Sequence, residues 1–128
     1  MTAAVRPLAT EQGATSYFTV TWVQGVPDED NPGEYLPGDP YDLTGCTARM
    51  QIRPTTISTD VWVTATTEND MITLGGVDGT ITVDIPAEET DKIVAKKGAY
   101  DIEVEFPDGR VVRVMQGVVN NSLSVTRD

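Results

Sequence analysis

The sequence predicts an all-β domain: an antiparallel sandwich or barrel of about seven strands with one short helical turn. Apolar and polar residues alternate through most of its hydrophobic runs, which is the period of a half-buried strand. Threonine and valine, both favoured in strands, are the commonest residues. Turn residues recur at roughly ten-residue spacing, the interval typical of sandwiches and barrels. A chain of 128 residues is long enough for one such domain.

The first part of the chain is expected to hold one strand between two irregular segments. Residues 1–14 show no apolar period and are predicted to form a flexible arm, which leaves residues 15–128 as the sandwich. Residues 17–23 alternate in polarity and form the first predicted strand. Its inward face would carry Phe18, Val20 and Trp22. Residues 24–41 combine prolines and glycines with five acidic residues, and we expect a long acidic surface loop there.

Four predicted strands follow this loop. Residues 47–53 alternate in polarity and end at Pro54, and three further strands are expected at residues 61–66, 71–74 and 80–85. Their inward side chains would be Ala48, Met50, Ile52, Val61, Val63, Ile81, Val83 and Ile85. The outward side chains of the first of these strands would be Arg49, Gln51 and Arg53.

The last third of the chain is expected to hold the helical turn and the closing strands. A proline followed by acidic residues suits a short helix from residue 86, which lysines and a glycine at 96–98 would end. Strands are predicted at 99–106 and 110–120, joined by a Pro-Asp-Gly turn, and a last short strand at 123–125. The predicted inward residues are Tyr100, Ile102, Val104, Phe106, Val112, Val114 and Gln116, with Glu103 and Glu105 outward.

Composition and charge exclude several classes of function. The chain has no histidine and one cysteine, which removes Ser-His-Asp and Cys-His catalysis, most zinc hydrolases and any internal disulfide. Its net charge of −11 is the reverse of the basic footprint that nucleic acids and anionic membranes require. The longest apolar runs are too short for a membrane helix, and residues 1–10 lack the pattern of a secretory signal. We therefore expect neither nucleic-acid nor membrane binding.

The strongest candidate site is an interface with another protein. Trp62 is out of phase with the neighbouring valines, so it could lie on an exposed face and anchor a partner, or pack locally. The acidic loop could meet a basic surface, or serve only for solubility. The candidate interface residues are Trp62, Asp28, Glu29, Asp30, Glu34 and Asp39.

Other candidate sites are weaker, and we expect no catalysis, metal or cofactor. The acidic loop lacks the spacing of an EF-hand calcium loop. Glu103 and Glu105 share one strand face, where nothing would desolvate an acid–base pair. Cys46 has no histidine to activate it and is expected to act as a small apolar residue.

Four segments carry a resemblance to a known family. Residues 42–53 read Asp-Leu-Thr-Gly-Cys-Thr-Ala-Arg-Met-Gln-Ile-Arg, and residues 79–87 read Gly-Thr-Ile-Thr-Val-Asp-Ile-Pro-Ala. Residues 98–104 read Gly-Ala-Tyr-Asp-Ile-Glu-Val, and residues 107–113 read Pro-Asp-Gly-Arg-Val-Val-Arg. In this order they resemble small phage and prophage structural proteins, and in particular the N-terminal module of upper-baseplate proteins that carry receptor-binding proteins. The resemblance covers residues 17–127.

The resemblance implies an immunoglobulin-like β-sandwich built into a virion, at the tail, baseplate or neck, without catalysis. Its partners would be other phage structural proteins, with the chain present as a homo-oligomeric ring or in repeated copies, assembled in the bacterial cytoplasm. Two alternatives stay open: a protein that decorates the capsid, and a carbohydrate-binding sandwich with Trp62 as the stacking platform. The number of copies per particle separates a capsid-decoration protein from a tail, baseplate or neck component. A carbohydrate-binding sandwich would need several aromatic side chains on one face.

Overall fold

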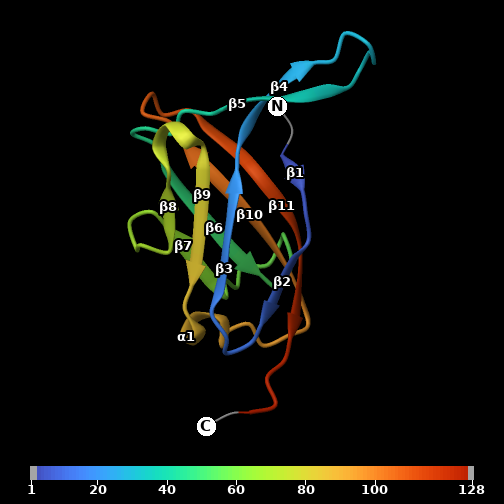
Figure 1. Cartoon of the computed structure of the whole chain (residues 1–128). Coiled ribbons are helices and arrows are strands. Elements are labelled where there is room, and N and C mark those ends of the chain that lie inside the picture. Colours follow the sequence, from blue (N-terminus) through green and yellow to red (C-terminus); the bar gives the residue numbers. More distant parts are fainter. Residues whose placement is uncertain (1–2, 127–128) are drawn as a thin grey trace.

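Two β-sheets pack face to face in the computed structural model, which describes residues 3–126 (Figure 1). The strands of sheet A are β1 (Ala4–Val5), β2 (Leu8–Glu11), β6 (Thr47–Arg53), β7 (Val63–Thr66), β10 (Lys97–Glu105) and β11 (Val111–Ser122). Sheet B contains β3 (Ser16–Thr21), β8 (Ile72–Leu74) and β9 (Thr80–Ile85). A separate two-stranded ribbon is made of β4 (Val23–Pro27) and β5 (Tyr35–Pro40). The predicted all-β sandwich is confirmed.

The core lies between the two sheets and follows the alternation of the sequence. Strand β6 buries every second residue, and β9 and β10 do the same. The side chains with no exposed surface include Ile52, Ile81, Val83, Ile85, Ile102 and Val104. The predicted helical segment is one turn, α1 (Ala87–Thr90), which Pro86 precedes. A short 3-10 turn occupies Gly76–Asp78.

A β-bulge changes the predicted phase of the last strand. Ile102 pairs with Met115 and Glu103 pairs with Arg113, so Val114 is an extra residue on β11. Val114 and Met115 are consequently both buried, and the inward set beyond the bulge continues with Val119. The prediction that Gln116 shares the inward phase was wrong. The predicted strand at 123–125 is also absent: β11 ends at Ser122, and residues 123–125 form no strand.

The N-terminal segment is part of the sheet, which corrects the prediction of a flexible arm at residues 1–14. Strands β1 and β2 both pair in parallel with the outer edge of β11. The Arg6 N–H donates to the Gln116 carbonyl over 2.9 Å, and the Gln12 N–H donates to the Ser122 carbonyl over 2.8 Å. Backbone pairing needs no apolar period, and it satisfies an edge that would otherwise be unpaired. Residues 1 and 2 lie outside the described residues.

The predicted acidic loop at residues 24–41 is a β-hairpin, which is a second correction. Strands β4 and β5 pair through Val26 opposite Leu36 and Pro27 opposite Tyr35. In a two-stranded ribbon each strand has one unpaired edge, where the missing N–H of a proline breaks no ladder bond. With the two N-terminal strands, the hairpin brings the described strands to eleven, seven of which correspond to predicted strands.

Candidate functional site

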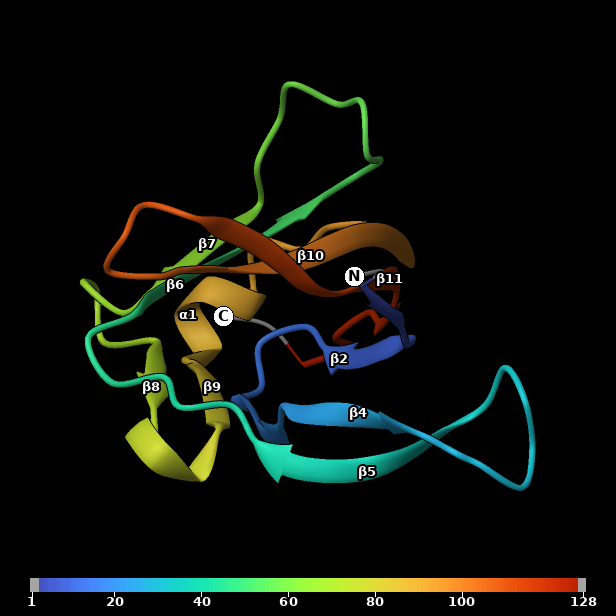
Figure 2. The ribbon, with the colours of Figure 1, turned by 90° about the horizontal axis from the view of Figure 1, so that it is seen from above.

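Hairpin β4–β5 projects from the body of the sandwich (Figures 1 and 2). It carries uncovered apolar side chains. All residues of its two strands are exposed except Gly38, which is partly buried. Tyr35 is 69% exposed, and Val26 and Leu36 are about half exposed. Apolar residues gathered on a projecting element mark an interaction site more often than scattered ones do.

The end of the hairpin, residues 28–34, holds four carboxylates and is here called the acidic tip. Asp28 orders the turn, since its carboxylate accepts hydrogen bonds from the Asp30 N–H over 3.0 Å and from Asn31 Nδ2 over 2.9 Å. The hydrogen bond from the Asn31 side chain, then that from the Asp30 N–H, hold the pKa of Asp28 below its ordinary value. Asp28 therefore stays ionised at neutral pH.

Aromatic packing fixes the direction of the hairpin at its root. The Trp22 ring stacks on Tyr41 with centroids 4.0 Å apart, and Phe106 lies at 6.0 Å. The Tyr41 N–H donates to the Trp22 carbonyl over 2.9 Å. Gly79 lies close to the Trp22 backbone with a φ of +68°. A Cβ at this position would lie 2.8 Å from the Trp22 carbonyl oxygen, so the close approach requires glycine. The hairpin is thus held in place rather than attached by a loose linker.

The structure brings together four of the six predicted interface residues. Asp28, Glu29, Asp30 and Glu34 are in the acidic tip, and Asp39 lies on β5, also exposed. Trp62 is elsewhere: it is half-buried and packs against the core. An added Cβ on Gly98 would lie 2.8 Å from Trp62 Cζ3, so the indole contacts that glycine. Of the two readings of Trp62, local packing is the one that the structure supports.

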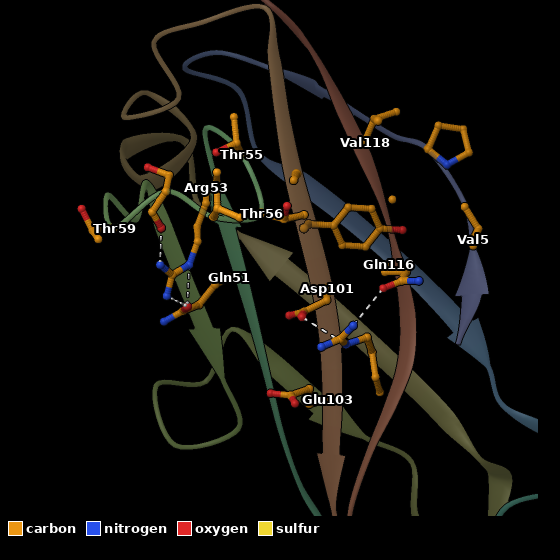
Figure 3. A pocket seen from close by; sticks show the side chains of 17 residues that line it. Val5, Gln51, Arg53, Thr55, Thr56, Thr59, Asp101, Glu103, Gln116 and Val118 are labelled. Carbon is orange, nitrogen blue, oxygen red and sulfur yellow. Dashed lines mark hydrogen bonds and ion pairs between the residues drawn. The ribbon is translucent and has the colours of Figure 1, made fainter. Parts of the chain in front are cut away.

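A groove of about 1010 Å³ crosses the outer face of sheet A and was not predicted (Figure 3). Its floor carries outward side chains of β6, β10 and β11, and the 54–60 loop and the β1 segment form its sides. We call it the sheet-A groove. Gln51, Asp101 and Gln116 form a row across its floor, with Asp101 paired to the other two in the strand register. Val5, Ile57 and Val118 line it with 73%, 91% and 53% of their surfaces exposed.

Arg53 is held rigidly within the sheet-A groove. Its Nε and Nη2 donate to Gln51 Oε1 over 3.2 and 2.7 Å, and its Nη1 donates to the Ser58 carbonyl over 2.6 Å. A guanidinium has five N–H donors, so one remains on Nη1 and one on Nη2. Within residues 3–126 no carboxylate lies within ion-pair distance of this guanidinium. Arg53 is therefore an oriented cation with free donors.

The other charged groups of the groove are already paired. Arg113 Nε lies 3.4 Å from Asp101 Oδ2, and Arg49 Nε lies 3.1 Å from Glu103 Oε1. Partial burial raises the pKa of Asp101, the Glu103 charge raises it further, and Arg113 opposes both. The only sequence indication of this surface was that the outward side chains of the strand at 47–53 include arginines, and this pattern does not indicate a groove.

The structure also places the residues that the sequence analysis considered for catalysis and metal binding. No group of three or more His, Cys, Asp or Glu side chains among residues 3–126 could hold a metal ion. Cys46 is partly buried, and burial, followed by the Asp42 charge, raises the pKa of its thiol. Glu103 is engaged with Arg49, and Glu105 is exposed. Within the same residues no helix is long and apolar enough to cross a membrane.

Comparisons with known proteins identify no family. No family model matches the chain, and no curated protein does. Among solved structures, the chain is similar to extracellular domains 3–5 of Drosophila OTK, with 13% sequence identity and a TM-score of 0.32. The match covers 90% of this chain and 32% of that chain. Likeness at this level identifies no function.

Proposed function

We propose that the chain is a non-enzymatic structural protein of a tailed-phage virion, a tail, baseplate or neck component with an immunoglobulin-like sandwich. The observation that carries an assembly role is hairpin β4–β5, a fixed projection with uncovered apolar residues and an acidic tip. The virion setting rests on the resemblance of the segments at 42–53, 79–87, 98–104 and 107–113 to phage structural proteins.

The hairpin suits docking for energetic reasons. A rigid element loses little conformational entropy when it binds, so less of the free energy of its contacts is lost to ordering than in a flexible loop. Its apolar residues would supply the buried centre of an interface, and its carboxylates would steer it toward a basic surface. A net charge of −11 keeps free copies apart until they meet such a surface.

The test replaces the apolar residues of the hairpin and measures entry into particles. Tyr35→Ser combined with Leu36→Ser should leave thermal unfolding unchanged, because both side chains are exposed, and should remove the chain from purified particles. Val94→Ser, at a position 65% exposed outside the hairpin, is the matched control and should enter normally. Particles that contain the hairpin variant at wild-type levels would remove the docking role of the hairpin, and purified particles that lack the wild-type chain would overturn the virion role.

Copy number decides between the proposed location and the capsid-decoration alternative. A tail, baseplate or neck ring would hold few copies per particle, and a decoration protein many. Quantitative mass spectrometry of purified particles against the major capsid protein measures this ratio. The carbohydrate alternative needed Trp62 as an open stacking platform, and the packing of its indole against Gly98 gives that alternative no support.

A further inference from the structure

The hairpin and the sheet-A groove both expose apolar side chains, and they carry charged groups of opposite sign. Seven of its exposed large apolar residues lie on them: Val23, Val26, Tyr35 and Leu36 on the hairpin, and Val5, Ile57 and Val118 at the sheet-A groove. The hairpin ends in four carboxylates, and the groove contains Arg53 with one free N–H on each terminal nitrogen. A carboxylate is the acceptor that a guanidinium with two open N–H groups binds best.

These surfaces cannot meet within one molecule. The 54–60 loop beside the groove and the hairpin lie on opposite sides of the sandwich (Figure 2). The aromatic contacts of Trp22 hold the hairpin in its outward direction. Contact between them therefore requires two copies, with the hairpin of one entering the groove of the next.

The size of the groove fits an element of chain rather than a small ion. About 1010 Å³ is at the upper end of the range for ligand pockets. The hairpin is a two-stranded ribbon with its carboxylates at its end, ahead of Tyr35 and Leu36. With the tip carboxylates at Arg53, these side chains would reach the apolar residues beside the groove.

We propose that the acidic tip of one copy binds the sheet-A groove of a second copy, with tip carboxylates on Arg53, as a head-to-tail contact. This inference rests on the proposed role of the hairpin as a docking element and names its partner. The two patches are different surfaces, so the contact is heterologous: repeated, it closes into a ring or grows as a filament.

The test uses the full chain and two charge reversals. Arg53→Glu disables the groove, and Glu29→Lys with Asp30→Lys disables the tip. Sedimentation velocity from micromolar to millimolar concentration should show self-association of the wild-type chain. Each variant alone should weaken it about tenfold or more, as expected for the loss of a close charge pair at an interface. Lys96→Glu, a charge reversal at an exposed residue outside those that line the groove, should associate like the wild type.

Mixing the two variants gives the sharpest outcome. The Arg53→Glu chain keeps its tip and the tip variant keeps its groove, so a mixture of the two should associate although each variant alone is weakened. The tip changes are at exposed residues, so the tip variant measured by itself tests the contact even where the fold does not tolerate Arg53→Glu.

Three results would overturn the inference: a wild-type chain that stays monomeric, variants that associate like the wild type, or a mixture that forms no complex. Failure of the proposed function is a separate result. A monomeric chain whose hairpin variants still fail to enter particles would show that the hairpin binds another protein. Hairpin variants that enter particles normally would instead remove the docking role itself.

Discussion

The hydrogen bond between Thr10 and Asn121 allows a direct test that the N-terminal segment belongs to the folded domain. Thr10 Oγ1 donates to Asn121 Oδ1 over 2.8 Å, and the residues are 4% and 6% exposed. Thr10→Val keeps the shape of the side chain and removes the donor, which leaves a buried amide oxygen unpaired. The free energy of unfolding should fall by about 1–3 kcal/mol, the cost of such a group.

Urea denaturation followed by tryptophan fluorescence measures this change. The midpoint should fall without a change in the slope of free energy against urea, because the folded surface is the same. The matched control is Thr19→Val, which removes a hydroxyl from an exposed pair with Thr82 and should stay within about 0.5 kcal/mol. Equal stability of Thr10→Val and the wild type would mean that residues 8–11 are detached in solution.

A double-mutant cycle shows whether the loss comes from this pair. Asn121 also donates through Nδ2 to the Ile93 carbonyl over 2.9 Å and to the Ala95 carbonyl over 3.0 Å. Asn121→Ala should therefore cost more than Thr10→Val, since it removes the donor to two carbonyls. The double variant should cost less than the sum by about 0.5 kcal/mol or more, the coupling expected of residues in contact. Additive losses would contradict the contact.

Three further predictions concern the core and the groove. Ile102→Ala, at a side chain with no exposed surface, should cost about 2–5 kcal/mol in urea melts, whereas Glu103→Gln at the surface should stay within about 0.5 kcal/mol; similar losses would refute the strand phase. Gly98→Ala should cost about 1–3 kcal/mol and shift the tryptophan emission, because its Cβ would lie 2.8 Å from Trp62 Cζ3; an unchanged spectrum would contradict the packing. The raised pKa of Asp101 means that folding favours its protonated form, so the wild type should gain stability relative to Asp101→Asn as pH falls from neutral toward 3.8; a relative loss would reverse the sign of the shift.

The central strands were predictable because their signal is local. In β6 and β9 every second residue is apolar and buried, and the boundaries of both strands are those expected from the sequence. The prediction failed at β11, where Val114 is inserted opposite β10 and turns Gln116 outward. A run of valines does not show where a bulge falls, because the extra residue is set by pairing with a distant strand.

The remaining errors also come from long-range pairing. Ala4 and Leu8 have neighbours on β11 more than a hundred residues away, and nothing in residues 1–14 encodes that partner. Prolines at 27, 37 and 40 argued against strands at 24–41, yet the ribbon accommodates them at its edges. Trp62 was ambiguous for the same reason, since its position depends on Gly98 from another strand.

The candidate surfaces combine residues that the sequence indicates with geometry that it does not. The acidic residues at 28–34 were visible as a cluster, but their projection on a fixed hairpin depends on Trp22 meeting Tyr41. Arg53 was visible as an outward residue, but its orientation depends on Ser58 in the adjoining loop. Charge patterns therefore located candidate residues, and tertiary contacts determined what each could bind.

The net charge of this chain opposes association between copies, whereas the local charges of the acidic tip and of Arg53 would favour it in one orientation. Copies at −11 repel one another on approach, although salt screens that repulsion beyond about 8 Å at physiological ionic strength. Apolar contact alone would have to overcome the remaining repulsion at every orientation. In the proposed contact, the approach that places the tip carboxylates beside Arg53 would convert repulsion into attraction before Tyr35 and Leu36 reach an apolar surface. Under this proposal the exposed apolar residues can stay uncovered on the free chain, because net repulsion opposes their non-specific association.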